Sequence, residues 1–167
     1  EGEGGAGKST LCAKIAWDWI KGLNFTEFNL VLLVRLRDSF DLTVGEAVKS
    51  YLSDNNSVEA KQLDQYILSN PDKVLIILDG FDEIDGDLTT RREIIQILLM
   101  KRFKSSRVIV TSRSWKADLI RQTPELAKAY AFIFVEGFNK ENLSIYIKKF
   151  YAKDLLSGQA LIQFMAD

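Results

Sequence analysis

The sequence predicts an α/β domain built on a mostly parallel sheet. Apolar runs of strand length recur along the 167-residue chain, and amphipathic stretches of helical period lie between them. A glycine-rich segment comes directly before the first of these helical stretches. Near-continuous apolar runs are typical of parallel strands covered on both faces, and alternating strands and helices favour βαβ units. The length fits one domain with a sizeable core.

The first predicted helix spans residues 8–21 and ends at Gly22. Its apolar residues, such as Ile15, fall on one face at helical spacing, and a glycine after the last periodic residue is a stop signal. A buried strand is predicted over 30–36, which reads LVLLVRL.

Two short helices are predicted next, each from an N-cap residue. Thr43 is expected to cap a helix through Tyr51. Ser57 is expected to cap a second helix over 58–68, which Asn70-Pro71 ends because the residue before proline disfavours the helical region.

The rest of the chain continues the alternation of strands and helices. Strands are predicted over 74–78, 107–111 and 131–135. Helices are predicted over 88–101, over 116–130 with a break near Pro124, after the cap residue Asn139, and over 157–165.

Composition excludes several classes of function. The net charge of −1, without a long single-sign run, gives no support to nucleic-acid or anionic-membrane binding. No apolar run approaches the roughly 18–20 residues of a membrane span. A single cysteine favours a reducing, intracellular setting. Without histidine, a Ser-His-Asp triad or a His-ligated metal is excluded from this chain.

Residues 2–9 read GEGGAGKS and match the phosphate-loop pattern G-x-x-x-x-G-K-[ST] in full. Small residues let backbone N–H groups curl around phosphate oxygens, and the following helix adds its N-terminal dipole. Lys8 is expected to reach the β- and γ-phosphates, Ser9 to offer its hydroxyl to Mg²⁺, and Thr10 to lie by the α-phosphate. The predicted nucleotide-binding residues are Gly2, Gly4, Gly5, Ala6, Gly7, Lys8, Ser9 and Thr10.

Acidic residues follow the predicted strand over 74–78. Ligands of parallel sheets gather at the carboxyl ends of strands, so Asp79 is expected to hold Mg²⁺ through its water shell. Asp82 and Glu83 lie just beyond and are candidates to orient or deprotonate an attacking water. One of the two alternatively serves only as a local hydrogen-bond acceptor.

Polar residues also follow the strand over 107–111. Arg113 is a candidate for contact with the γ-phosphate, and either Thr111 or Ser112 is expected to bond a nearby water or carboxylate. The alternative for Arg113 is a solvated surface arginine.

Taken together, these motifs resemble the NACHT family of signal-transducing P-loop ATPases. The matching stretches read GEGGAGKSTL, KIAWDW, VLLVRLRD, VLIILDGFDE, RVIVTSR and VEGFNKENLSIYIKKFY, and they cover nearly the whole chain. The form LDGFDE, with a small residue after the first acid and then an acidic pair, is the most specific. Ser114 departs from the family, which often has proline after the sensor arginine.

The resemblance implies a three-layer αβα sandwich with strand order 5-1-4-3-2. The first strand, expected before the phosphate loop, is missing from this sequence, which we interpret as truncation of a longer protein. Residues 1–152 are assigned to the NACHT domain and residues 153–167 to the start of a helical region. By position, Lys8 and Ser9 match the first motif. Asp79, Asp82 and Glu83 match the second, and Arg113 matches the sensor arginine.

The function implied is a cytoplasmic switch that binds ATP or ADP with Mg²⁺, hydrolyses ATP slowly and controls oligomerisation of a NOD-like receptor type protein. Its implied partners are nucleotide, other copies of the domain, and flanking effector and sensor domains. Two alternatives remain: a high-turnover motor ATPase, with Arg102 or Arg121 acting on a neighbouring copy, or a nucleotide-binding scaffold without hydrolysis. The absence of a guanine-reading N-K-x-D motif favours ATP over GTP.

Overall fold

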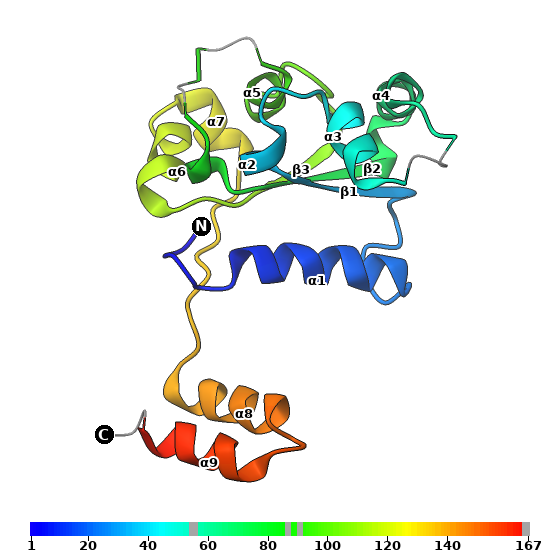
Figure 1. The fold of residues 1–167 in the computed structure, drawn as a ribbon. Helices are drawn as coiled ribbons and strands as arrows, with labels where there is room; N and C mark the ends of the chain where they lie inside the picture. The colour runs from blue at the N-terminus through cyan, green and yellow to red at the C-terminus, as the bar shows by residue number, and fades with distance from the viewer. Residues whose placement is uncertain (54–56, 86–87, 90–91, 165–167) are drawn as a thin grey trace. The chain divides into compact units, whose positions relative to one another are not determined.

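The computed structural model describes residues 1–53, 57–85, 88–89 and 92–164. Two compact units divide the chain, one over Glu1–Val135 and one over Glu136–Asp167. The first unit holds the sheet and the helices that cover it (Figure 1). Within the described ranges, no helix has the length and apolar character needed to cross a bilayer.

The predicted parallel sheet is present in the first unit. Its described strands are β1 (Leu30–Arg35), β2 (Val74–Asp79) and β3 (Arg107–Val110). They lie in the order β1-β2-β3, and both neighbouring pairs are parallel. Val34 pairs with Leu78, which pairs in turn with Val110, so all three strands end at the same edge. These neighbours agree with the 4-3-2 part of the predicted order, and the fold class is confirmed.

Helices cover both faces of this sheet. Helix α1 (Lys8–Ile20) lies on one face, and α3 (Val44–Tyr51) and α4 (Ala60–Ser69) lie on the other (Figure 1). Because side chains alternate along a strand, successive residues of β2 enter different cores. Leu75 and Ile77 pack with Cys12 and Ile15 of α1.

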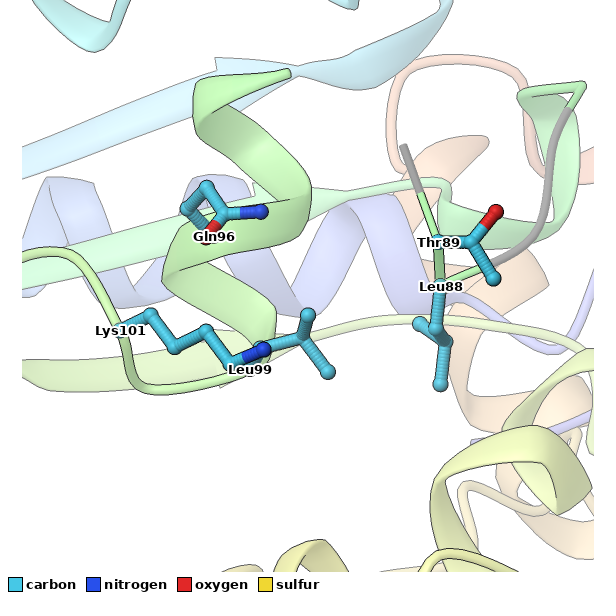
Figure 2. Close-up of a pocket in the computed structure, with 5 residues that line it drawn as sticks. All are labelled: Leu88, Thr89, Gln96, Leu99 and Lys101. Atoms are coloured by element: carbon cyan, nitrogen blue, oxygen red, sulfur yellow. The ribbon is translucent and has the colours of Figure 1, made fainter. Parts of the chain in front are cut away.

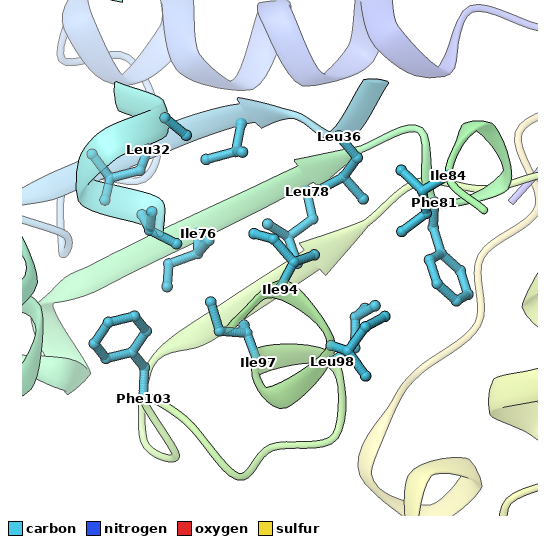
Figure 3. Packing of buried hydrophobic residues seen from close by; sticks show 14 of the residues in the cluster. Leu32, Leu36, Ile76, Leu78, Phe81, Ile84, Ile94, Ile97, Leu98 and Phe103 are labelled. Carbon is cyan, nitrogen blue, oxygen red and sulfur yellow. The ribbon is translucent and has the colours of Figure 1, made fainter. Parts of the chain in front are cut away.

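The larger core lies on the other face of the sheet. Ile76 and Leu78 of β2 point toward Ile94 and Leu98 of α5 (Glu93–Leu98), all of them buried (Figure 3). Burial on both faces explains why the strand sequences are almost continuously apolar.

The two predicted caps in residues 43–69 differ in outcome. Thr43 caps α3 as predicted, and its hydroxyl and Glu46 form a reciprocal capping box. Helix α4 begins at Ala60, later than predicted, because Glu59 and Gln62 form the box there in place of Ser57. A short helix, α2 (Leu36–Ser39), directly continues β1 and was not predicted.

Helix α5 is much shorter than the predicted helix over 88–101. Leu88 and Thr89 lie in a turn, and part of the predicted range, at 90–91, lies outside the described residues. The helix ends early because Met100 has a φ of 55°, outside the right-handed region, and the N–H groups of Lys101 and Arg102 both turn back to the Gln96 carbonyl.

The later helices follow the prediction closely. The break near Pro124 separates α6 (Ser114–Arg121) from α7 (Pro124–Ala129). In the second unit, the Asn139 side chain caps α8 (Lys140–Phe150) as expected. It is followed by α9 (Leu155–Phe164); the predicted end of this helix at Met165 lies outside the described residues.

The predicted strand over 131–135 is not a regular strand in the structure. It pairs with a single residue: the Glu1 amino group donates to the Ile133 carbonyl, and the Val135 N–H donates to the Glu1 carbonyl. On the other side, the Gly2 N–H donates to the Ser112 carbonyl. A largely apolar cavity of about 410 Å³ separates β3 from this segment. Because this cavity lies between them, residues 131–135 do not pair with β3 and have almost no backbone to pair with.

Candidate functional site

The glycine-rich segment forms a tight loop that ends at the N-terminus of α1. Gly7 is the residue before the first turn, and its φ of 96° is one that residues with a Cβ rarely adopt. In the part of the chain that the structure describes, no side chain caps the first turn of α1. Its N–H groups and the helix dipole therefore offer a site for an anion.

Lys8 closes over this loop. Its ammonium Nζ donates to the carbonyl oxygens of Gly2 and Glu3, at 2.7 and 2.9 Å. The loop backbone thus holds the positive charge of Lys8 at the phosphate loop, and Lys8 also lines the cavity described below.

The end of β2 brings Asp79 close to two side chains from other elements. The Thr111 hydroxyl donates to Asp79 Oδ1 at 2.5 Å, and the Cys12 Sγ lies 3.8 Å from the same oxygen. Burial raises the pKa of the Cys12 thiol to about 12, and the adjacent Asp79 carboxylate adds to the effect. Cys12 therefore remains a protonated donor on the buried face of α1.

Asp82 and Arg113 form a double contact across two strand ends. The Arg113 N–H donates to Asp82 Oδ1 at 3.0 Å, and the Arg113 Nε lies 3.2 Å from Asp82 Oδ2. The Arg113 guanidinium also lies beside Gly4, where an added Cβ would be 3.4 Å from its terminal nitrogen. Arg113 is therefore fixed at the phosphate loop by a carboxylate that is almost fully buried.

The Glu83 side chain contacts a different arginine from the one that Asp82 contacts. Its Oε2 lies 2.9 Å from Nε of Arg37, a residue of α2, and both side chains are substantially exposed. The Glu83 side chain packs over Gly80, whose φ is 88° and where an added Cβ would meet it at 3.2 Å. A glycine after Asp79 is thus needed both for the turn and for the room it leaves.

Most of the predicted site residues line one cavity of about 270 Å³. Its lining combines the phosphate loop, the end of β2 and the end of β3, and it consists of Gly4, Gly5, Gly7, Lys8, Ser9, Thr10, Asp79, Gly80, Asp82, Glu83, Thr111 and Arg113. Gly2 and Ala6 do not line it, although Gly2 supplies a carbonyl to Lys8. The predicted residues are therefore brought together from segments up to about a hundred positions apart in the chain.

The donor set of this cavity suits a hard cation shared with phosphate. Within the described ranges, no three His, Cys, Asp or Glu residues cluster as a metal-binding group. Ser9 and Asp79 nevertheless face the same cavity and offer oxygen atoms. Mg²⁺ is commonly held by one or two protein oxygens together with substrate phosphates and water, so these residues fit it.

Two contacts of the site were missed from the sequence. Arg37 lies on α2, which was not predicted, and the sequence pattern gave Cys12 no role in the site. A signal for Arg37 was available, because it follows the strand that neighbours β2 and the ends of parallel strands meet at one edge. No pattern in the sequence indicated that Cys12 would reach Asp79.

A separate hollow of about 670 Å³ lies over α5. Leu88, Thr89, Gln96, Leu99 and Lys101 line it (Figure 2). Among the described residues that line it there is no predicted site residue and no acidic side chain.

The fold and the loop define a P-loop nucleotide-binding domain of the α/β class. A sequence model of the NACHT domain matches residues 1–154. The chain therefore belongs to the NACHT domain family.

Curated relatives agree with this assignment. The chain is 28% identical over 174 residues to NACHT, LRR and PYD domains-containing protein 1 homolog of Danio rerio, covering 95% of this chain and 13% of the relative. It is 26% identical over 170 residues to nucleotide-binding oligomerization domain-containing protein 2 of Homo sapiens, covering 89% and 15%. To human NACHT, LRR and PYD domains-containing protein 10 it is 22% identical over 173 residues, covering 96% and 25%. The chain thus spans a quarter or less of each of these relatives.

Proposed function

We propose that this chain is the nucleotide-binding module of a NOD-like receptor type signalling protein. In this role it binds ATP or ADP with Mg²⁺, hydrolyses ATP slowly, and uses the difference between the two nucleotides to control self-association. The observation that supports this role most directly is the single cavity shared by the phosphate loop, Asp79, the acidic pair and Arg113.

Binding is assigned to the loop and the end of β2. Lys8 would exchange its two carbonyl partners for phosphate oxygens. The N–H groups at the start of α1 would donate hydrogen bonds to the phosphates. Ser9 and Asp79, which both line the cavity, would hold Mg²⁺. When bound, the ion would neutralise charge that develops on the phosphates. The chain's own task is to keep these oxygen donors in place.

The two acids of the pair are proposed to have different tasks. Both oxygens of Asp82 are engaged by Arg113, so Asp82 is assigned to positioning that arginine next to Gly4. Glu83 is more exposed, and its side chain pairs with the solvent-accessible Arg37. Glu83 is therefore the candidate to orient or deprotonate the attacking water.

The contacts of two other arginines weigh against a motor. Arg102 pairs with Glu93 of α5 at 3.2 Å. Arg121 pairs with Asp118 at 2.9 Å and with Glu1. Both candidates for an arginine acting on a neighbouring copy are thus occupied within their own chain.

Turnover and nucleotide affinity in the full-length protein test the proposed function. A switch is expected to bind ATP and ADP with measurable affinity, gain affinity from Mg²⁺, and hydrolyse ATP at a slow rate that Glu83→Gln lowers. A rapid rate would favour the motor, and no rate with intact binding would favour the scaffold. Absence of nucleotide binding would overturn all three.

A further inference from the structure

Thr111 occupies a special place between the two strand ends. Its backbone is bonded to β2 and to the turn that follows: the Thr111 N–H donates to the Leu78 carbonyl at 2.9 Å, and the Phe81 N–H donates to the Thr111 carbonyl at 2.8 Å. Its side chain is almost fully buried. The position of the hydroxyl is thus set by the backbone on both sides.

The direction of the hydroxyl proton follows from its neighbours. A threonine hydroxyl has one proton to donate and accepts through its lone pairs. The Gly80 N–H donates to Thr111 Oγ1 at 2.9 Å, which uses an acceptor site. The hydroxyl proton is then free to point at Asp79 Oδ1, 2.5 Å away. Hydrogen bonds to an ionised carboxylate are among the stronger ones in proteins.

The second oxygen of Asp79 has a different environment. Oδ1 receives both the Thr111 hydroxyl and the Cys12 thiol, whereas Oδ2 has no hydrogen-bond or ion-pair partner among the residues that the structure describes. Asp79 lines the cavity that also holds Ser9 and Lys8. One oxygen is therefore anchored to the protein, and the other remains available at the cavity.

We propose that Thr111 is a positioning residue that anchors Oδ1 of Asp79 and so presents Oδ2 to the divalent cation. This inference rests on the proposed function, because it assumes that Asp79 serves a nucleotide-bound cation. It adds a residue that acts on the cation through Asp79 without contacting it. Partners of this kind orient a ligand, and their loss typically costs about 10–100-fold in metal affinity.

The test compares variants of Thr111 in the full-length protein. Thr111→Val keeps the shape and removes the hydroxyl, while Thr111→Ser restores it. Ser112→Ala is the matched control, because it removes a hydroxyl at the same strand end that donates to the Arg113 carbonyl and not to Asp79. The measurement is the affinity for a fluorescent ADP analogue, first with EDTA and then during a titration with Mg²⁺.

The expected result is a selective loss of the magnesium effect. Thr111→Val should weaken the apparent Mg²⁺ affinity by about 10–100-fold while the affinity with EDTA stays at the wild-type value. Thr111→Ser should recover most of the loss, and Ser112→Ala should match the wild type. If Thr111→Val has a lower melting temperature than the wild type, the same titration is made with Thr111→Ala. That second variant then decides whether loss of the hydroxyl weakens Mg²⁺ binding.

The failure of this inference is distinguishable from failure of the proposed function. If the wild type gains affinity from Mg²⁺ and a folded Thr111 variant without the hydroxyl gains it equally, Thr111 does not position Asp79. The same conclusion follows if Thr111→Ser behaves like Thr111→Val. If the wild type binds no nucleotide, or gains nothing from Mg²⁺, the proposed function itself is wrong and the inference fails with it.

Discussion

Arg113 and Asp82 are joined through both the backbone and the side chain of the arginine. Asp82 Oδ1 accepts the Arg113 N–H and Oδ2 pairs with Nε, so the carboxylate fixes the start of α6 and the guanidinium at once. Because the guanidinium lies beside Gly4, the turn after β2 and the turn after β3 meet directly over the phosphate loop. A ligand phosphate at this point would contact a charge that is already in position.

Arg113→Ala is expected to reduce discrimination between ATP and ADP. A switch responds only to its differential affinity for the two nucleotides, and the γ-phosphate is the chemical difference between them. ATP affinity should fall by about 1.5–3 kcal/mol, the usual worth of a charged hydrogen bond, with ADP nearly unchanged. Parallel titration of the full-length protein with ADP and a non-hydrolysable ATP analogue measures this. Equal losses of affinity for both nucleotides would mean that a residue other than Arg113 contacts the γ-phosphate.

Asp82→Asn distinguishes a positioning acid from a catalytic base. The amide oxygen can still accept the Arg113 N–H, but the ion pair is lost. We expect ATP affinity to fall in the same direction as for Arg113→Ala, by a smaller factor, with ADP affinity retained. A variant that binds ATP like the wild type and has lost hydrolysis would instead identify Asp82 as the base.

Lys8→Ala should weaken the binding of both ATP and ADP. Removing the ammonium leaves the phosphates without a charge-assisted bond worth about 1.5–3 kcal/mol, so both affinities should fall by about ten- to a hundredfold. Lys21→Ala, at the opposite end of α1, is the matched control and should change neither. Calorimetric titration provides the measurement. An unchanged nucleotide affinity of Lys8→Ala would contradict the assignment of residues 2–9 as a phosphate-binding loop.

Glu83→Gln should slow ATP hydrolysis without preventing ATP binding. The variant keeps the shape of the side chain and leaves Lys8, Ser9 and Asp79 intact, so ATP should still bind. Single-turnover hydrolysis should fall by roughly 10²–10⁴-fold if Glu83 is the general base. Glu125→Gln on α7, which does not line the cavity, should retain the wild-type rate. Retained hydrolysis in Glu83→Gln would exclude the proposed role.

The cavity between β3 and residues 131–135 predicts that one added strand there would strongly raise the stability of the domain against denaturant. A strand there would pair with backbone groups on both sides and fill an apolar space of about 410 Å³. Residues 1–167 should therefore unfold at lower denaturant concentration than a version extended by about ten of the native residues before Glu1, the upper end of usual strand lengths. Equal midpoints would contradict the assignment of this cavity to a central strand.

Local patterns were sufficient for most elements of the fold. The apolar runs at β1, β2 and β3 and the caps at Thr43 and Asn139 are visible in the sequence because burial on both faces and helix capping depend on a few neighbouring residues. The phosphate loop is similar, since its pattern encodes a short stretch of backbone. The rule that ligands gather at the carboxyl ends of parallel strands then predicted that Asp79 and Arg113 would meet the loop.

Only the tertiary structure decided which of these residues pair with one another. The pairing of Asp82 with Arg113, of Glu83 with Arg37, and of Thr111 with Asp79 joins residues about thirty to almost fifty positions apart. Such pairs depend on strand register and on the direction of each turn, and a sequence pattern contains neither. The same reason explains residues 131–135: their apolar sequence predicts a strand, but a strand forms only where a neighbouring backbone is present to pair with it.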